Sequence, residues 1–194
     1  MFVTLEGIDG SGKTTQAELL AKALGDDTVL VREPGGTPAS ERIRELVADP
    51  AVELDPAAEL LLFCAARAQL VAEVIRPALD AGRNVVSDRF SDSTAAYQGA
   101  GRGVSVEVAV SVNLVATGRL EPDVTILLRI DPELAASRSL GEDRFEREGV
   151  EFQRRVAEAY ERLARSDPSR IKVVDAEGDV DEVHARVMEV VGAP

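Results

Sequence analysis

The sequence has 194 residues, enough for one compact domain with a sizeable core. Its 45% hydrophobic and 29% charged residues are typical of a water-soluble globular protein and argue against a disordered or membrane-spanning chain. The 35 acidic and 22 basic residues give a formal net charge of −13, which argues against a nucleic-acid partner because that partner is also anionic.

Targeting signals and disulfides also bear on the class of protein. The N-terminus has no basic segment followed by an apolar stretch and a cleavage site, and no apolar run approaches bilayer length. The only cysteine, Cys64, lies in the apolar run LLLFCAA, which predicts that it is a buried small hydrophobic residue. The only histidine, His184, is expected on a solvated helix surface. These features predict a cytoplasmic protein without a membrane partner.

Short apolar runs alternate with stretches that have apolar residues at helical spacing. In chain order they predict a strand at 2–6, helix 14–24, strand 28–33, helix 39–47, a long helix 57–82, strand 84–90, helices 92–101 and 104–117, strand 123–130, a short helix from Asp131, helix 150–165, strand 171–176 and helix 179–191. Because most strands are apolar throughout, we expect a five-stranded parallel sheet covered by helices on both faces. No linker or repeat interrupts this pattern, so we expect a single three-layer α/β domain over residues 1–194.

The segment GIDGSGKT fits the pattern G-x-x-x-x-G-K-[ST] and lies between a predicted strand and a predicted helix. Its glycines allow a tight turn whose backbone N–H groups converge on an anion, and the helix N-terminus adds partial positive charge. In this motif Lys13 reaches the outer phosphates and the Thr14 hydroxyl binds Mg²⁺. The sequence therefore predicts binding of a nucleoside triphosphate by Gly7, Ile8, Asp9, Gly10, Ser11, Gly12, Lys13, Thr14 and Thr15.

Further polar and aromatic residues predict a second, nucleotide-sized site. Glu33 ends one predicted strand, and Asp88 and Arg89 end another, so all three are expected at the crevice where parallel strands finish. Phe63 and Arg67 are four residues apart and share one face of the long helix. A phenyl ring stacks on bases, and a guanidinium binds phosphates or carbonyls. Taken singly, most of these residues are better explained by core packing, solvation or a local salt bridge, and only together with the phosphate loop do they favour a second site.

Four runs, GIDGSGKTTQ, REPGGT, LLLFCAARAQLV and SDRFSDSTAAYQGAGRG, resemble in this order the bacterial thymidylate kinases (dTMP kinases). The resemblance extends over essentially the whole chain. It implies a P-loop kinase fold with a short lid, and phosphorylation of dTMP to dTDP with ATP and Mg²⁺, a step of dTTP synthesis. It also implies a homodimer formed by helices that pack across a two-fold axis.

The resemblance implies roles for individual residues at the acceptor site. Phe63 would stack on thymine, and Arg67 would contact the edge of the base. Arg89 would bind the dTMP phosphate, with Arg44 as a second contact. Asp88, beside Arg89, would hold Mg²⁺ together with Thr14.

The same resemblance describes the surroundings of the sugar and the base. Thr94 and Gln98 would face the base, and Tyr97 would lie against the deoxyribose and disfavour a 2′-hydroxyl. Asp9 would face the side of the sugar that carries the 3′-hydroxyl. The same wall would be shaped by Glu33 and Pro34.

Residues 137–149, with the run SRSLGEDRFE, resemble the lid of the family. Gly10 stands where some relatives carry an arginine, and in such members the lid is thought to supply the catalytic arginine. Arg138 and Arg144 are the candidates here, although this lid is short and lacks the further arginine that usually lies between them. A salt bridge within the lid is the alternative for Arg144. The predicted catalytic residues are Asp9, Lys13, Arg89, Arg138 and Arg144.

Two other functions are compatible with the phosphate-binding motif, because GTPases, ATPases and small-molecule kinases share it. One is a kinase of another nucleoside, nucleotide or small metabolite. The other is a nucleotide-dependent switch or binding module that transfers nothing, although the N-K-x-D guanine motif of GTPase switches is absent from the sequence. For a kinase of a phosphate acceptor we expect no general base, since the attacking phosphate oxygen is already ionised.

Overall fold

The structure is a computed structural model that describes residues 1–138 and 148–192. In this part of the chain five parallel strands form one sheet with the order β2-β3-β1-β4-β5. The strands are β1 (Phe2–Glu6), β2 (Val29–Arg32), β3 (Val85–Asp88), β4 (Val124–Arg129) and β5 (Ile171–Asp175).

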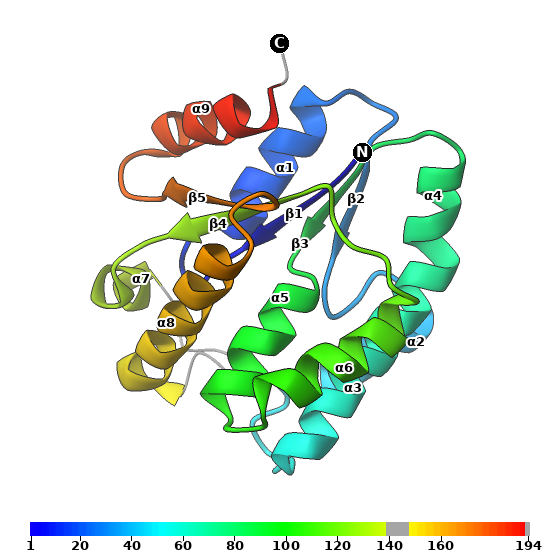
Figure 1. Ribbon diagram of the computed structural model, residues 1–194, viewed down its shortest axis with the longest axis vertical. Helices are drawn as coiled ribbons and strands as arrows, with labels where there is room; N and C mark the ends of the chain where they lie inside the picture. The colour runs from blue at the N-terminus through cyan, green and yellow to red at the C-terminus, as the bar shows by residue number, and fades with distance from the viewer. Residues whose placement is uncertain (139–147, 193–194) are drawn as a thin grey trace.

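Helices cover both faces of the sheet (Figure 1). On one face α1 (Lys13–Ala23) contacts β1 and β3, and α9 (Val180–Val191) contacts β4 and β5. On the other face lie α8 (Val150–Ser166), the segment of α5 (Ser91–Thr94) and η2 (Ala95–Gly101), and α3 (Pro56–Leu70). Two further helices pack against α3, namely α2 (Pro38–Ala48) and α6 (Val106–Thr117), and α7 (Pro132–Arg138) follows β4. The sheet is therefore the middle of three layers.

The strand register brings the carboxyl ends of β1, β2 and β3 to one edge. Asp88 is opposite Leu5 of β1 and opposite Arg32 of β2. The residues that follow these strands are the glycine-rich loop, the segment that begins at Glu33 and the segment that begins at Arg89. Three segments far apart in the sequence thus emerge side by side, as expected for parallel strands.

The predicted long helix is interrupted in the structure. The stretch is divided into α3, a π-helical turn η1 (Val71–Ile75) and α4 (Arg76–Asp80), and the backbone N–H of Arg76 bonds to the carbonyl of Val71. Pro77 follows directly and has no N–H to donate to the carbonyl four residues earlier. A wider turn at this position is compatible with that missing hydrogen bond.

A second predicted helix, residues 92–101, also changes type. It is α-helical in α5 and π-helical in η2, and the N–H of Arg102 bonds to the carbonyl of Tyr97 at 2.8 Å. Gly101 lies against α8 here, because a Cβ atom on it would come within 2.9 Å of the Phe152 ring. The wider turn therefore coincides with a close approach of two elements.

Cys64 is buried, as predicted. His184 was expected on a solvated surface, but it is half-buried and its Nδ1 lies 3.1 Å from Oε1 of Gln16, because α9 packs against α1.

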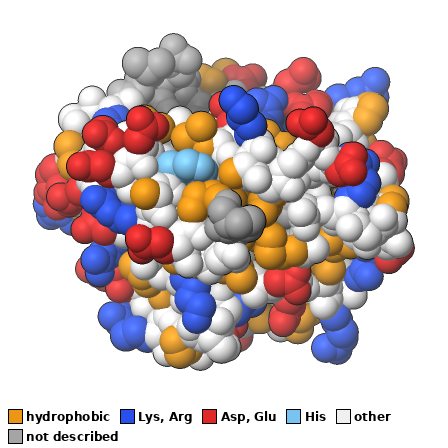
Figure 2. All heavy atoms as spheres, turned by 90° about the horizontal axis from the view of Figure 1, so that it is seen from above, with side chains coloured by type: hydrophobic (Ala, Val, Ile, Leu, Met, Phe, Trp, Pro, Cys, Tyr) orange, Lys and Arg blue, Asp and Glu red, His pale blue; other side chains and the backbone are white. Residues whose placement is uncertain are grey.

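No helix within the described residues has the length and apolarity to cross a bilayer. On the face that Figure 2 shows, basic side chains are interspersed with acidic ones.

Candidate active site

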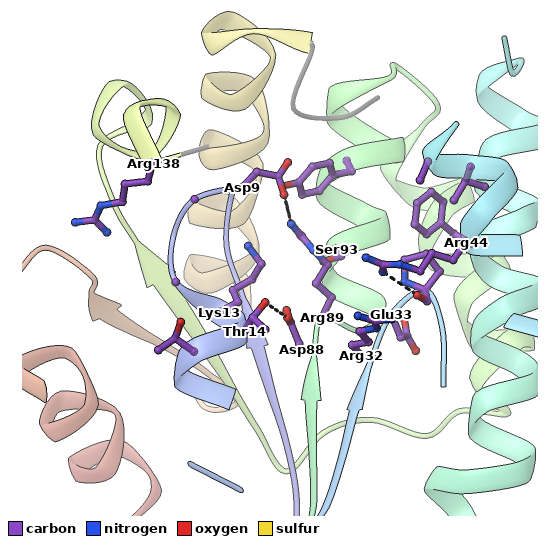
Figure 3. Close-up of a pocket in the computed structure, with 18 of the residues that line it drawn as sticks. Asp9, Lys13, Thr14, Arg32, Glu33, Arg44, Asp88, Arg89, Ser93 and Arg138 are labelled. Carbon is purple, nitrogen blue, oxygen red and sulfur yellow. Dashed lines mark hydrogen bonds and ion pairs between the residues drawn. The ribbon is translucent and has the colours of Figure 1, made fainter. Parts of the chain in front are cut away.

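A cavity of about 760 Å³ lies at the carboxyl ends of β1, β2 and β3. Its size is within the usual range for a small-molecule site. Its walls come from the glycine-rich loop, the segments after β2 and β3, helices α2 and α3, the end of α7 and residues 178–180 at the start of α9 (Figure 3). The cavity thus joins the predicted phosphate loop to the predicted second site.

The glycine-rich loop turns from β1 into α1. Gly10 and Gly12 have φ values of 78° and 89°, a region that favours glycine. A Cβ atom on Gly10 would come within 2.2 Å of the carbonyl oxygen of Ala135, which leaves no room for a larger side chain. The absence of an arginine at this position in the sequence therefore agrees with the close packing of α7 on the loop.

Lys13 begins α1, and its ammonium group turns back into the loop. Its Nζ donates to the carbonyl of Ile8 at 2.6 Å and to Oγ of Ser11 at 3.3 Å. Burial and the nearby charge of Arg89 lower the pKa of Lys13 to about 8, although Asp9 and other acidic groups partly oppose this shift. The loop therefore holds a buried cation at its centre.

Thr14 and Asp88 provide hard oxygen atoms next to Lys13. The Thr14 hydroxyl donates to Oδ2 of Asp88 at 2.6 Å (Figure 3). Oδ1 of Asp88 is buried and has no hydrogen-bond partner among the described residues. A carboxylate and a hydroxyl beside a phosphate loop fit Mg²⁺, which usually takes one or two protein oxygens together with phosphates and water. The described residues contain no cluster of three or more His, Cys, Asp or Glu side chains that could hold a metal.

Arg89 forms the centre of the second half of the cavity. Its guanidinium pairs with Asp9 rather than with the neighbouring Asp88 and lies 4.8 Å from the centre of the Tyr97 ring (Figure 3). It also donates to the carbonyl of Gly7 and to the hydroxyl of Ser93, each at 3.2 Å. Burial acts to raise the pKa of Asp9, but the charges of Arg89 and Lys13 outweigh it and hold that pKa below its ordinary value.

The opposite wall carries most of the predicted acceptor residues. Phe63 is half-buried on α3 and lines the cavity. Arg44 of α2 also lines it and donates to the carbonyl of Pro34 at 3.0 Å. Burial raises the pKa of Glu33, against the opposing charge of Arg67. The cavity wall also contains Pro34, Tyr97 and Gln98.

Arg67 and Thr94 are not among the residues that line the cavity, so the roles at the base that the resemblance implies for them stay a prediction. The Arg67 side chain is 1% exposed. It donates to Oε2 of Glu33 at 2.7 Å, to the Thr94 hydroxyl at 2.7 Å and to the carbonyl of Phe90 at 2.9 Å, and it also contacts Asn113. Because these groups engage its donors, Arg67 connects α3 to β2, α5 and α6 behind the wall.

The lid is only partly described. Arg138 ends α7, is exposed and lies at the opposite end of the cavity from Arg44 (Figure 3). Arg144 and most of the predicted lid lie outside the described residues. The choice between these two arginines therefore stays a prediction.

Some residues near the site had not been predicted. Gln153 of α8 donates to Oδ2 of Asp9 at 2.9 Å, and its Oε1 lies 3.4 Å from the backbone nitrogen of Asp9. A polar residue on the buried face of an amphipathic helix was the signal that could have revealed it. Residues 178–180 also line the cavity, and their place just after β5 could have indicated this. Ser93 and Arg32 line it as well, and both lie in runs that carry the family resemblance, although no role was predicted for either.

Comparisons with known proteins agree with this arrangement. A family model described as thymidylate kinase matches residues 5–187. The chain is 46% identical to a thymidylate kinase of Deinococcus radiodurans, over 96% of this chain and 94% of that one. It is 49% identical to a thymidylate kinase of Syntrophotalea carbinolica, over 96% and 92% of the two chains.

The fold has a similar counterpart among solved structures. The crystal structure of thymidylate kinase from Ehrlichia chaffeensis superposes with a TM-score of 0.83 at 36% identity. The match covers 99% of this chain and 98% of that one. The predicted α/β P-loop kinase fold is thereby confirmed. From its sequence, its fold and its site, the chain belongs to the thymidylate kinase family.

Proposed function

We propose that this protein transfers the γ-phosphoryl group of ATP to dTMP, giving dTDP and ADP. The observation that carries the proposal is that one cavity is lined both by Lys13 of the phosphate loop and by Arg89 and Phe63. ATP would place its phosphates at the loop, and dTMP would place its phosphate at Arg89 and its base on Phe63. The two reacting phosphates would then meet inside the cavity.

Electrostatics is the main demand that this reaction makes on the protein. Two unit charges 4 Å apart repel by about 4 kcal/mol at an effective dielectric constant of 20, and each phosphate carries more than one charge. Lys13 and Arg89 supply local positive charge in a chain whose net charge is −13. The acceptor oxygen is already ionised, so the residues need only position and neutralise the phosphates. Asp9 would keep the Arg89 guanidinium in place between turnovers.

Mg²⁺ belongs to the proposal because Thr14 and Asp88 fit it. The Thr14 hydroxyl and the Asp88 carboxylate would hold the ion, directly or through water. When bound, Mg²⁺ neutralises phosphate charge during transfer. We further propose that Arg138 or Arg144 adds positive charge at the transferring group.

The experiment that tests the function is a coupled assay of ADP release over a panel of acceptors. We expect kcat/KM for dTMP to exceed the values for dUMP, dCMP, AMP and thymidine by at least tenfold. A higher value for another acceptor would indicate a different kinase. ATP binding without any dTDP would indicate a binding module, and either result would overturn the proposal.

Assembly and location are part of the same proposal. We propose a homodimer in which α3 and α6 pack against their copies, since these neighbouring helices expose large apolar side chains. Leu61 is 57% exposed, Val108 49% and Val115 84%. The location in the cytoplasm stays a prediction from the sequence.

A further inference from the structure

Glu6, the last residue of β1, is a buried carboxylate to which the proposed reaction gives no role. Its side chain is fully buried, and it is not among the residues that line the cavity. Oε1 accepts hydrogen bonds from the backbone N–H groups of Phe90 at 2.7 Å and Ser93 at 3.2 Å. Oε2 accepts from the hydroxyls of Ser93 at 2.5 Å and Tyr160 at 2.7 Å. Donors from two separate segments therefore converge on one carboxylate.

Two of these donor residues, Phe90 and Ser93, closely follow Arg89, which has an unfavourable backbone conformation. Arg89 has a φ of 73°, in the left-handed region, which costs a residue other than glycine about 1–2 kcal/mol. Such a conformation persists only where the surroundings hold it. The N–H of Arg89 bonds to the carbonyl of Leu5 at 3.0 Å, and its carbonyl accepts from the Ser87 hydroxyl at 2.6 Å. The next N–H along the chain, that of Phe90, is the one held by Glu6.

Glu6 also reaches the Arg89 side chain through one intermediate. The Ser93 hydroxyl donates to Oε2 of Glu6 and accepts from Nη1 of Arg89 at 3.2 Å. In Figure 3 Ser93 lies beside Arg89, whose guanidinium is directed at Asp9. Glu6 therefore contacts the peptide after Arg89 and, through Ser93, the guanidinium itself.

We propose that Glu6 is a positioning residue that holds Arg89 in its left-handed conformation and so directs its guanidinium into the cavity. This inference rests on the proposed function, in which Arg89 binds the dTMP phosphate. A general structural role has a different consequence, because lost stability alone would not weaken dTMP binding selectively.

The chemistry of the contacts indicates which variants separate these roles. The two backbone N–H groups need an acceptor, which a glutamine amide oxygen supplies, and the two hydroxyls can turn to accept from its NH₂ group. Glu6→Gln therefore preserves the hydrogen bonds, whereas Glu6→Leu leaves buried donors without an acceptor. Glu6→Asp keeps the charge but withdraws the carboxylate by one methylene. This variant tests the positioning role if Glu6→Leu does not fold.

The test compares dTMP affinity by calorimetry with the KM for ATP. We expect Glu6→Leu to weaken dTMP binding at least tenfold and Glu6→Asp at least threefold, with the KM for ATP within twofold of wild type. Glu6→Gln should bind dTMP within threefold of wild type. Val187→Ala, a core truncation in α9, is the control for lost stability and should leave dTMP affinity unchanged.

An Arg89→Ala background shows whether Glu6 acts through Arg89. Arg89→Ala alone should weaken dTMP binding at least tenfold, and adding Glu6→Asp should then change it by less than twofold. If Arg89→Ala weakens dTMP binding but the Glu6 variants do not, or if they affect ATP equally, the positioning role is wrong. If Arg89→Ala leaves dTMP binding unchanged, the proposed phosphate contact fails and the positioning role fails with it.

Discussion

The Glu6 carboxylate, to which we assign a positioning role, lies where its surroundings disfavour its charge. Burial, together with the charge of Asp92, raises its pKa to about 7 from an ordinary value of 4.5. The hydrogen bonds from Ser93 and Tyr160 and the charge of Arg89 oppose this rise but do not cancel it. At neutral pH the folded protein therefore keeps a partly ionised carboxylate in a place that disfavours its charge.

The pKa of Glu6 leads to a prediction for stability against pH. Between pH 4.5 and 7 the folded state retains a proton that the unfolded state has released, so the free energy of unfolding falls as pH rises through this window. Replacement by glutamine removes the titrating group. We expect the stability of wild type relative to Glu6→Gln to fall by about 3 kcal/mol between pH 4.5 and 8. Urea unfolding of both proteins at several pH values measures this difference in the free energy of unfolding. The contributions of all other carboxylates are common to both proteins and cancel in the difference. A difference that stays constant or grows with pH would contradict the assigned pKa.

Helix α8 shows how one element supports several site residues. Gln153 and Tyr160 lie on its buried face and contact Asp9 and Glu6, respectively. Phe152, on the same helix, lies against Gly101 at the end of η2. The position of α8 therefore depends on a close approach that a side chain at residue 101 would disturb.

Gly101→Ala tests this packing. Alanine normally favours a helix over glycine by about 1 kcal/mol, but here its Cβ would meet the buried Phe152 ring at 2.9 Å. We expect the steric term to win and the free energy of unfolding to fall by about 1–3 kcal/mol, measured by urea titration. The double variant Gly101→Ala, Phe152→Leu should recover part of this loss. An alanine variant as stable as wild type would mean that α8 moves aside freely.

The whole molecule combines an excess of acidic residues with a cavity that holds Lys13 and Arg89 and with an exposed apolar region on α3 and α6. The net charge of −13 opposes the association of two copies at long range. The apolar side chains of Leu61 and Val115 favour it at short range, since each would lose contact with water in an interface. Dimerisation should therefore strengthen as salt screens the repulsion.

The proposed assembly gives a prediction at the scale of the whole molecule. Wild type should sediment with twice the mass of one chain, and the variant Leu61→Asp, Val115→Asp should sediment as a monomer at the same concentration because a buried unpaired charge is costly. Val173→Asp, on edge strand β5, is the control because it places the same charge at a 40% exposed valine outside α3 and α6, and it should stay dimeric. A monomeric wild type, or a dimeric double variant, would place the interface elsewhere or remove it.

Much of the site could be predicted because its signals are local. The phosphate loop is a continuous motif, and Glu33, Asp88 and Arg89 follow strands whose carboxyl ends must meet at one edge. Phe63 and Arg67 were assigned to one helix face, yet Phe63 reaches the cavity and Arg67 lies behind its wall. Helical spacing does not predict how deeply neighbouring residues bury a side chain. Here Glu33 and Thr94 bind the Arg67 guanidinium within the protein.

Short-range patterns in the chain were sufficient for the alternation of strands and helices, the parallel sheet and the phosphate loop, because each depends on residues close together in sequence. Three-dimensional packing was needed for the pairing of Arg89 with Asp9, 80 residues away, and for the contacts of Gln153 and Glu6. Those contacts depend on the exact approach of distant elements and on which buried polar group finds a partner. The order of residues along the chain does not show which distant polar groups meet, whereas the folded structure does.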